Sequence, residues 1–338
     1  MSEIQSAKLI VREYQQAFDV APSEGLVDTL MRYTANAYHW RGMHPFYEHH
    51  TASAVCESFW LPFRAAFVAS QRREDIFLCG RNDVDGGESV WVCSMGHFMG
   101  LFDHPWLGIP PTGRIAFLPY AEFHRVVDGK IAETALFCDI IKVMQQAGHY
   151  PLPPQAGAAF IHPGPRTHDG VKLGACEPEA ALETMALVNR MVADLDHLNK
   201  TGIDECSPEY LARSWREDMA WFGPAGIGST YTIARYQAQH QLPFRKGLTD
   251  KVYHGHVARF AEDNFAAFFG WANLSNRSRG GWLGMPEAAK PSEMRVVDVY
   301  RREGDRLAEN WVFIDLLHYF SLQGLDLLGR MRELNGPA

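Results

Sequence analysis

Two aspartates in strongly apolar stretches are the residues of this 338-residue chain best suited to chemistry. Asp139 lies within Ala-Leu-Phe-Cys-Asp-Ile-Ile, and Asp315 lies within Trp-Val-Phe-Ile-Asp-Leu-Leu. Burial of a lone carboxylate is costly unless it is paired, protonated or used in a reaction. Desolvation raises its pKa toward neutrality, which suits a group that removes and returns a proton next to a carbonyl. An aspartate that reaches water at a strand end, or that bonds an arginine or the backbone, fits the same pattern, so both interpretations stay open.

His97 is the histidine with the clearest pattern. It alternates with Cys93 and Met95 in an aromatic and β-branched stretch, so these side chains share one face of a predicted strand. On that face His97 could donate a hydrogen bond to a developing enolate or hold Asp139 in position. A histidine that simply packs in the core is the alternative interpretation.

Several other histidines raise the question of a metal site. Four of them gather around Trp40: His39, His44, His49 and His50. Their spacing is loose, the nearby carboxylate is Glu48, and neither HExxH nor HxxEH occurs. We therefore predict no metal and place these histidines, including His44, in a loop at the rim of a pocket. His254 and His256 alternate on a strand and are interpreted as structural.

The elements that must position these residues occur twice, because the chain contains two diverged copies of one domain. The motif LPFR at residues 61–64 recurs at 242–245, a shift of 181 positions, and WLGIP at 106–110 recurs as WLGMP at 282–286, a shift of 176. The first shift also matches Trp40 with Trp221, and the second matches Asp139 with Asp315. Two ungapped blocks in the same order, separated by one five-residue deletion, indicate an internal repeat.

The repeat assigns a counterpart to each candidate residue. Asn273 stands where the first copy has His97, and Trp311 stands where it has Ala135. His124 shares strand parity with Glu122, and the second copy has Tyr300 and Asp298 at the matching positions. We predict that a further set of residues lines the pocket or its rim: Trp40, His44, His124, Trp221, His240, Asn273, Tyr300 and Trp311.

Within one copy the pattern predicts helices first and strands later. Helical spacing of apolar residues covers 5–18 and 51–68, and strands are expected at 89–99, 114–127 and 130–143, with a hairpin turn at Asp128-Gly129. The second copy repeats strands at 264–274, 293–302 and 306–317. Helices followed by antiparallel strands predict an α+β fold with a pocket between helices and sheet. We expect domains at 1–147 and 179–338, joined by a Pro/Gly-rich linker or ordered arm at 148–178.

Composition narrows the classes of function. The chain is 46% hydrophobic and 21% charged, which is typical of a folded globular protein rather than a disordered one. A net charge of −8 without a Lys/Arg run argues against nucleic acid and anionic membranes as partners. No apolar stretch is long enough for a transmembrane helix, and the first residues are unlike a secretory signal. Six cysteines are spread singly, which favours reduced thiols and a cytoplasmic location.

The motifs resemble one known family. Met95-Gly96-His97, the run from Leu107 to Arg114, and the run from Val127 to Glu133 followed by Asp139 are similar to the SnoaL-like polyketide cyclases of the nuclear-transport-factor-2-like (NTF2-like) superfamily. The second copy is similar through residues 282–286, 304–309, Trp311 and Asp315, and residues 231–234 and 239–244 fit as well. Together the two resemblances cover about 250 residues, nearly everything except the linker.

This resemblance implies two tandem cone-shaped α+β barrels, each with helices packed on a curved, mainly antiparallel sheet around a deep apolar cavity. It also implies cofactor-independent acid/base catalysis, such as aldol-type ring closure, on a small apolar carbonyl compound. By motif position the catalytic residues are Asp139 and His97 in the first copy and Asp315 in the second, and the first copy is the favoured working site. Because single-domain relatives usually dimerise, the two copies are expected to form an intramolecular pseudo-dimer, with further homo-oligomers open.

Other functions remain open because one fold can serve several reactions. Epoxide hydrolysis or dehydration in the same pocket would need Asp, Arg and Asn around a water, and Arg125 and Arg301 could contribute only if they point inward. A noncatalytic binder of small hydrophobic molecules would have neither aspartate in a cavity. A protein-interaction module would instead expose an apolar patch.

Overall fold

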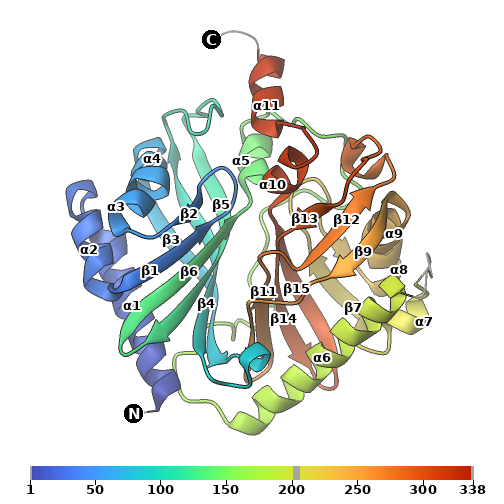
Figure 1. Ribbon diagram of the computed structural model, residues 1–338, viewed down its shortest axis with the longest axis horizontal. Coiled ribbons are helices and arrows are strands. Elements are labelled where there is room, and N and C mark those ends of the chain that lie inside the picture. The colour runs from blue at the N-terminus through green and yellow to red at the C-terminus, as the bar shows by residue number, and fades with distance from the viewer. Residues whose placement is uncertain (1, 201–205, 336–338) are drawn as a thin grey trace. The chain divides into compact units, whose positions relative to one another are not determined.

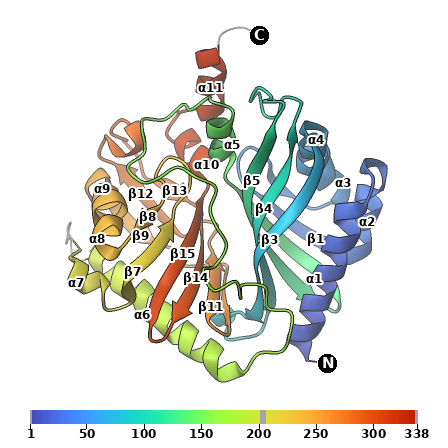
Figure 2. The same ribbon diagram turned by 180° about the vertical axis from the view of Figure 1, so that it is seen from behind.

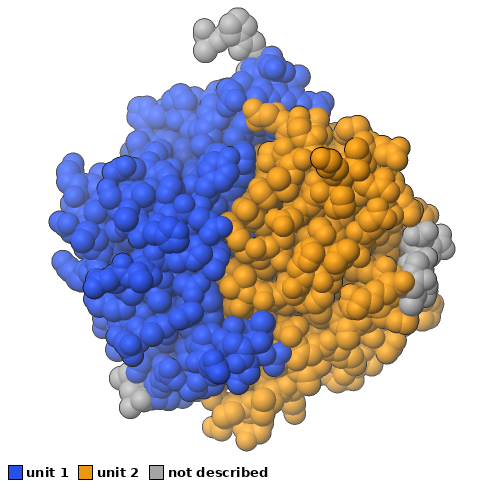
Figure 3. All heavy atoms as spheres, in the orientation of Figure 1, with its two compact units in different colours: residues 1–150, 163–175, 327–338 blue, residues 151–162, 176–326 orange. Residues whose placement is uncertain are grey.

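The computed structural model describes residues 2–200 and 206–335, which divide into two compact units. Figure 3 colours unit 1 (residues 1–150, 163–175 and 327–338) and unit 2 (151–162 and 176–326). The Pro/Gly-rich segment contributes backbone pairs to each unit. Phe77 pairs with Val171 in unit 1, and Ala158 pairs with Ser229 in unit 2. The segment is therefore an ordered arm rather than a free linker.

Unit 1 is an α+β unit built on one six-stranded sheet. The strand order is β2-β1-β6-β5-β4-β3, and every neighbouring pair is antiparallel except β1 with β6. Helix α1 contacts β3, β4, β5 and β6, so it covers one face of the sheet (Figures 1 and 2). The strands are β1 (Thr34–Gly42), β2 (Tyr47–His49), β3 (Phe67–Arg81), β4 (Val90–Phe102), β5 (Ile115–Val127) and β6 (Lys130–Cys138). The helices are α1 (Glu3–Val20), α2 (Leu26–Tyr33), α3 (Ala52–Val55), α4 (Leu61–Ala66), α5 (Ile140–Gln146) and α11 (Leu327–Asn335).

Unit 2 repeats this architecture with one addition. Its six-stranded sheet has the order β8-β7-β15-β14-β11-β10, again with one parallel pair, β7 with β15. A second, three-stranded sheet has the order β13-β12-β9. The strands are β7 (Trp215–Phe222), β8 (Thr230–Tyr231), β9 (Leu248–Tyr253), β10 (Ala258–Glu262), β11 (Phe265–Phe269), β12 (Leu274–Ser278), β13 (Ser292–Met294), β14 (Val296–Glu303) and β15 (Arg306–Ile314). The helices are α6 (Pro178–Lys200), α7 (Pro208–Leu211), α8 (Ile233–Tyr236), α9 (Leu242–Gly247) and α10 (Leu316–Ser321).

The strand register confirms the repeat and its two shifts. Trp40 lies opposite Thr134 in the parallel pair of unit 1, and Trp221 lies opposite Asn310 in that of unit 2. These partners differ by the shifts of 181 and 176 positions found in the sequence. Each tryptophan also needs the glycine two positions later, because a Cβ at Gly42 or Gly223 would lie 2.1 or 2.0 Å from the indole ring. The predicted α+β class is thus confirmed in both units.

The helix expected at 51–68 is present but widened in its middle. Residues Cys56–Trp60 form a π-helical turn between α3 and α4, and Gln237–Gln241 form the same turn between α8 and α9. Pro62 and Pro243 are the second residues of the α-helices that follow these turns. Because a proline has no N–H to donate to the preceding turn, the helix relaxes locally into the wider hydrogen-bond pattern.

Two strand predictions are wrong at their ends for a shared reason. The strands expected to reach Val143 and Leu317 end at Cys138 and Ile314, and the helices α5 and α10 begin two residues later. Asp139 and Asp315 lie at these junctions and cap the helices, accepting hydrogen bonds from Lys142 N at 2.9 Å and His318 N at 3.1 Å. A side-chain oxygen at the N-cap satisfies a backbone N–H that the helix itself leaves unpaired.

The strand expected at 264–274 is broken in two. β11 ends at Phe269, β12 begins at Leu274, and the neighbouring strand is likewise divided into β9 and β10. In unit 1 the corresponding strands β3 and β4 are continuous over 15 and 13 residues. The breaks at 254–257 and 270–273 thus distinguish unit 2 from unit 1.

Candidate active site

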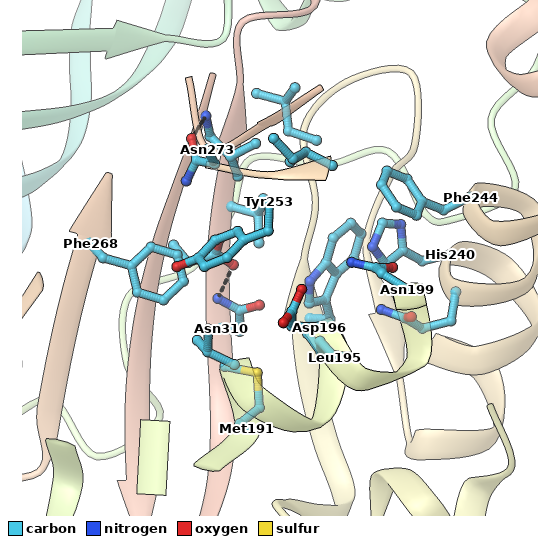
Figure 4. Close-up of a pocket in the computed structure, with 18 of the residues that line it drawn as sticks. Met191, Leu195, Asp196, Asn199, His240, Phe244, Tyr253, Phe268, Asn273 and Asn310 are labelled. Atoms are coloured by element: carbon cyan, nitrogen blue, oxygen red, sulfur yellow. Dashed lines mark hydrogen bonds between the residues drawn. The ribbon is translucent and has the colours of Figure 1, made fainter. Parts of the chain in front are cut away.

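A cavity of about 170 Å³ lies in unit 2, between the strands of its sheets and helices α6, α8 and α9. Figure 4 shows side chains that converge on it from α6, from α9 and the turn before it, and from the sheets. Its wall is mainly aromatic and apolar, with rings from Trp215, Trp221, Tyr236, Phe244, Tyr253, Phe268 and Tyr300. The polar side chains on it are Asp196, Asn199, His240, Gln241, Arg245, His256, Asn273, Asp298 and Asn310. The cavity is therefore a binding site of the common kind, apolar with a few placed polar groups.

Asp298 is the carboxyl group on the sheet side of this cavity. Successive residues of β14 face opposite sides of the sheet, so Asp298 and Tyr300 face the cavity together. Asn310 lies opposite Tyr300 on β15, and its amide donates to Asp298 Oδ1 at 3.2 Å (Figure 4). Burial raises the pKa of Asp298 to about 6, although hydrogen bonds from Asn310 and Tyr300 act in the opposite direction. Asp298 can therefore exchange a proton near neutral pH.

His240 lies on the helical side of the cavity as a neutral imidazole. It stacks on Trp221 with ring centroids 4.0 Å apart. Burial, together with the positive charge of Arg245, lowers the pKa of His240 to about 3. Its Nδ1 is shielded from solvent and has no hydrogen-bond partner among the described residues. His240 is thus an uncharged hydrogen-bonding group at neutral pH.

The broken strands supply further lining residues. Tyr253 ends β9, and His256 lies in the break that follows, where its ring stacks on Phe268 at 3.9 Å. Tyr253 Oη and His256 Nδ1 are 3.3 Å apart. Burial lowers the pKa of His256 to about 3, so this imidazole is neutral as well. The expectation that His254 and His256 lie on a strand is wrong, because both lie in the break between β9 and β10, and His256 lines the cavity.

Four residues predicted at a pocket line this cavity: Trp221, His240, Asn273 and Tyr300. Asn273 also holds the broken strand, since its Oδ1 accepts a hydrogen bond from Val296 N at 2.7 Å. Trp311 lies outside the lining set and stacks on Phe222 at 5.4 Å. Asp315 is outside it as well; it is fully buried, caps α10 and lies 3.6 Å from Arg295.

The interior of unit 1 is organised differently at the equivalent place. Glu122, the counterpart of Asp298, lies 3.0 Å from Arg72 and 3.3 Å from His124. Burial alone would raise the pKa of Glu122, but the imidazole of His124 and the guanidinium of Arg72 lower it to about 2. Arg72 also lies over the rings of Phe98 and Tyr120. The carboxyl group of unit 1 is thus held ionised inside a charged network.

The other residues predicted for unit 1 lie apart from this network or only support it. His97 contacts Asp75 through Nδ1 at 3.2 Å, and Pro119 lies between His97 and Asp139, pairing with both. Two strand spacings, roughly 9–10 Å, therefore separate these two residues in the sheet. Trp40 is buried and stacks on His49, and His44 lies at the ring of Tyr47. His124 is fully buried and lies 3.0 Å from Thr134 Oγ1.

The histidine cluster near Trp40 has ordinary partners. His39 Nε2 lies 2.6 Å from Glu48, and His39 stacks on His50. Among residues 2–200 and 206–335, no group of three or more His, Cys, Asp or Glu side chains is arranged to hold a metal ion. In the same part of the chain, no helix has the length and apolarity needed to cross a bilayer.

Sequence reasoning named Asp298 only as the counterpart of Glu122, and it missed Asn310, Tyr253 and Arg245 as cavity residues. One available signal was the repeated LPFR motif, which contains Arg245. A second was Asn310, an amide that stands in the second copy where the first copy has Thr134. Tyr253 had no comparable signal, because it reaches the cavity through a strand break that the pattern did not reveal.

Comparison with known proteins confirms the family resemblance over part of unit 1. Residues 83–147, about a fifth of the chain, match the family model of the SnoaL-like polyketide cyclases. This region contains β4, β5, β6 and α5. No curated protein gives a match.

The similar solved structures are chains somewhat less than half as long as this one. A SnoaL-like protein from Jannaschia sp. CCS1 is 18% identical with a TM-score of 0.35, and the alignment covers 46% of this chain and 98% of that one. IdmH from Streptomyces antibioticus is also 18% identical, with a TM-score of 0.35 and coverages of 43% and 99%. An NTF2-like protein from Burkholderia xenovorans LB400 is 14% identical, with a TM-score of 0.32 and coverages of 42% and 97%.

Proposed function

We propose that unit 2 is an acid/base catalyst of the cyclase or isomerase type, which transfers a proton next to the carbonyl group of a small substrate. The observation that carries this proposal is Asp298, a carboxyl group with a pKa of about 6 in a cavity with a largely aromatic wall. The SnoaL-like match supports the reaction class, because unit 2 is the structural repeat of the unit that contains the match.

In this mechanism Asp298 acts as the base. Above pH 6 its carboxylate accepts a proton from the carbon next to the substrate carbonyl, and the negative charge moves to the carbonyl oxygen. A neutral donor on the cavity wall, the imidazole of His240, suits that oxygen because it adds no charge of its own. Return of the proton from Asp298 to another carbon gives an isomer. Attack of the enolate on a second carbonyl of the same substrate closes a ring, and the new alkoxide takes up the proton.

Unit 1 supports this chemistry less well. Glu122, with its pKa of about 2 and its contact with Arg72, is a weak base at neutral pH. The acid/base roles of Asp139, His97 and Asp315 stay predictions, and the capping hydrogen bonds of the two aspartates support a structural role for them.

Water-activating hydrolysis is also less well supported. Arg125 bonds Glu133 at 2.7 Å, and Arg301 bonds Glu303 at 2.9 Å and also Glu309. Neither arginine lines the cavity. Arg245 does line the cavity, but it lies on α9 and not on the strands that carry Asp298 and Asn310. The Asp298–Asn310 pair therefore fits proton transfer on carbon better than activation of water for epoxide opening.

The experiment is hydrogen–deuterium exchange at carbon, followed by NMR on small ketones such as cyclohexanone and acetophenone in D₂O. The wild-type protein should accelerate loss of the α-proton signal, and Asp298→Asn should reduce this rate by roughly 100-fold or more, the usual contribution of a general base. Asp305→Asn, on an exposed turn, serves as the matched control. An Asp298→Asn variant that keeps the wild-type rate would contradict the proposal, and loss of exchange in Asp139→Asn or Asp315→Asn instead would relocate the base.

A further inference from the structure

A buried arginine lies on the cavity wall without a carboxylate partner among residues 2–200 and 206–335. Arg245, on α9, is 3% exposed and lines the cavity. Its Nε donates to Gln241 Oε1 at 3.2 Å, and its Nη1 donates to Asn199 Oδ1 at 3.1 Å. No carboxylate among the described residues contacts it, and Nη2 makes no hydrogen bond within them. Because a buried cation is costly unless a counter-charge accompanies it, this site favours an anionic ligand.

The equivalent arginine of unit 1 shows what Arg245 lacks. Arg64 donates to Phe18 O at 2.6 Å and to Ala21 O at 2.7 Å, so it closes the carboxyl end of α1. Such a position is favourable for a cation, because the last carbonyls of a helix carry partial negative charge. The counterpart of Phe18 in unit 2 is Asn199, whose side-chain amide oxygen accepts from Arg245 instead. Arg245 therefore lacks the helix-end carbonyl partners that Arg64 has, and it lies on the cavity wall instead.

Arg245 and Asp298 lie on different parts of the same cavity. Burial raises the pKa of Tyr236; the charge of Asp298 adds to this rise and the charge of Arg245 opposes it. Tyr236 is thus within electrostatic reach of both groups. By contrast, the pKa of Asp298 is set by burial, Asn310 and Tyr300, without a contribution from Arg245. A ligand that spans the cavity can meet both charges.

We propose that the ligand of this cavity is a small one-ring carboxylic acid, with its carboxylate on Arg245 and its reacting carbon toward Asp298. This inference rests on the proposed function and adds the class of substrate to it. The cavity volume of about 170 Å³ is close to that of an engineered cavity, roughly 150 Å³, that accommodates benzene. The rings of Trp221, Tyr236 and Phe244 lie on the wall and can pack against such a ring. The free N–H groups of Arg245 can form charge-assisted hydrogen bonds to the carboxylate.

The test compares two isosteric probes, benzoate and benzamide, by isothermal titration calorimetry and by the intrinsic tryptophan fluorescence, to which Trp215 and Trp221 of the cavity wall contribute. Wild-type protein should bind benzoate at least tenfold more tightly than benzamide. Arg245→Met should remove this preference, Arg245→Lys should keep part of it, and the exposed Arg235→Met should leave it unchanged. Equal binding of the two probes by the wild-type protein would overturn the proposal without any variant, and so would an undiminished preference in a folded Arg245→Met protein.

Asp298→Asn separates this inference from the proposed function. The variant should bind benzoate as tightly as the wild type or more tightly, because removal of a carboxylate from the cavity reduces repulsion. If benzoate is preferred but no ketone exchanges its α-proton, the anion site stands and the acid/base function fails. If exchange depends on Asp298 but benzoate has no advantage over benzamide, the function stands and the carboxylic acid fails as the substrate class.

Discussion

Glu122 and Asp298 are equivalent carboxyl groups, but their pKa values are shifted in opposite directions because their neighbours differ. The strand register pairs Arg72 with Phe98 in unit 1 and Tyr253 with Leu274 in unit 2, so Tyr253 occupies the place of Arg72. The second shift likewise places Tyr300 where unit 1 has His124. Both of these neighbours of the carboxyl group are therefore replaced by tyrosines. Burial is no longer offset, and the pKa rises to about 6 instead of falling to about 2.

These two shifts predict opposite effects of pH on stability. The pKa of Asp298 in the folded protein lies above its ordinary value, so its stabilising contribution is present at low pH and is lost as the pH rises through about 6. The pKa of Glu122 lies below its ordinary value, so its contribution is present above about pH 4.5 and is lost as the pH falls toward 2. Unit 2 thus retains a group that is unfavourable at neutral pH, as expected of a functional residue.

The α-proton exchange rate should rise with pH and reach half of its plateau near pH 6, because only the ionised Asp298 can accept a proton. The measurement is the NMR exchange assay from pH 4.5 to 8, expressed as kcat/KM. Tyr253→Arg, which restores the cation present in unit 1, should move the midpoint well below 6 and lower the plateau, since a weaker base is a poorer catalyst. A wild-type profile that is flat over this range would exclude Asp298 as the titrating base.

At the scale of elements, the cavity depends on where strands stop. By strand register, Phe269 is equivalent to Met95 and Leu274 to Phe98. Two residues, 96–97, lie between these positions in unit 1, whereas four residues, 270–273, lie between them in unit 2. Two additional residues cannot be accommodated in a regular ladder, so β11 and β12 separate and join different sheets. The neighbouring strand is also interrupted, at 254–257 between β9 and β10. These two interruptions expose Tyr253, His256 and Asn273 to the cavity. A small insertion has thus separated strands that are continuous in unit 1.

Helix capping gives a testable prediction at this scale, which concerns Asp139. Asn caps helices about as well as Asp, whereas Ala does not. Asp139→Ala should therefore lower the free energy of unfolding by about 1 kcal/mol, and Asp139→Asn should change it by a few tenths at most. Urea unfolding at pH 7 measures both values. If Asp139→Asn is as stable as the wild type but has lost α-proton exchange, Asp139 is the acid/base group that the family resemblance implies, and the capping role is secondary.

At the scale of the whole molecule, the sequence predicted the fold well because folding depends on features that both copies share. The apolar periodicity, the Trp-x-Gly contact and the hairpin turn occur in both units, so each copy supports the interpretation of the other. The candidate site depends on features that the copies do not share. His240 replaces Phe59, Tyr253 replaces Arg72, and residues 270–273 interrupt a strand. Because the two copies differ at these positions, comparison of the copies could not identify the residues of the candidate site.

This contrast predicts that the two units divide stability and activity between them. Glu122→Gln removes a buried carboxylate from contact with Arg72 and His124, and it should lower the free energy of unfolding at pH 7 by about 3–5 kcal/mol. At pH 3 the loss should be smaller, because protonation already weakens the wild-type network as the pH approaches 2. The α-proton exchange rate per folded molecule should remain at the wild-type value, while Asp298→Asn should show the reverse combination of effects. Urea unfolding at both pH values and the NMR assay on the same samples measure this division. An exchange rate that falls in Glu122→Gln beyond the loss of folded protein would make unit 1 part of the catalytic machinery.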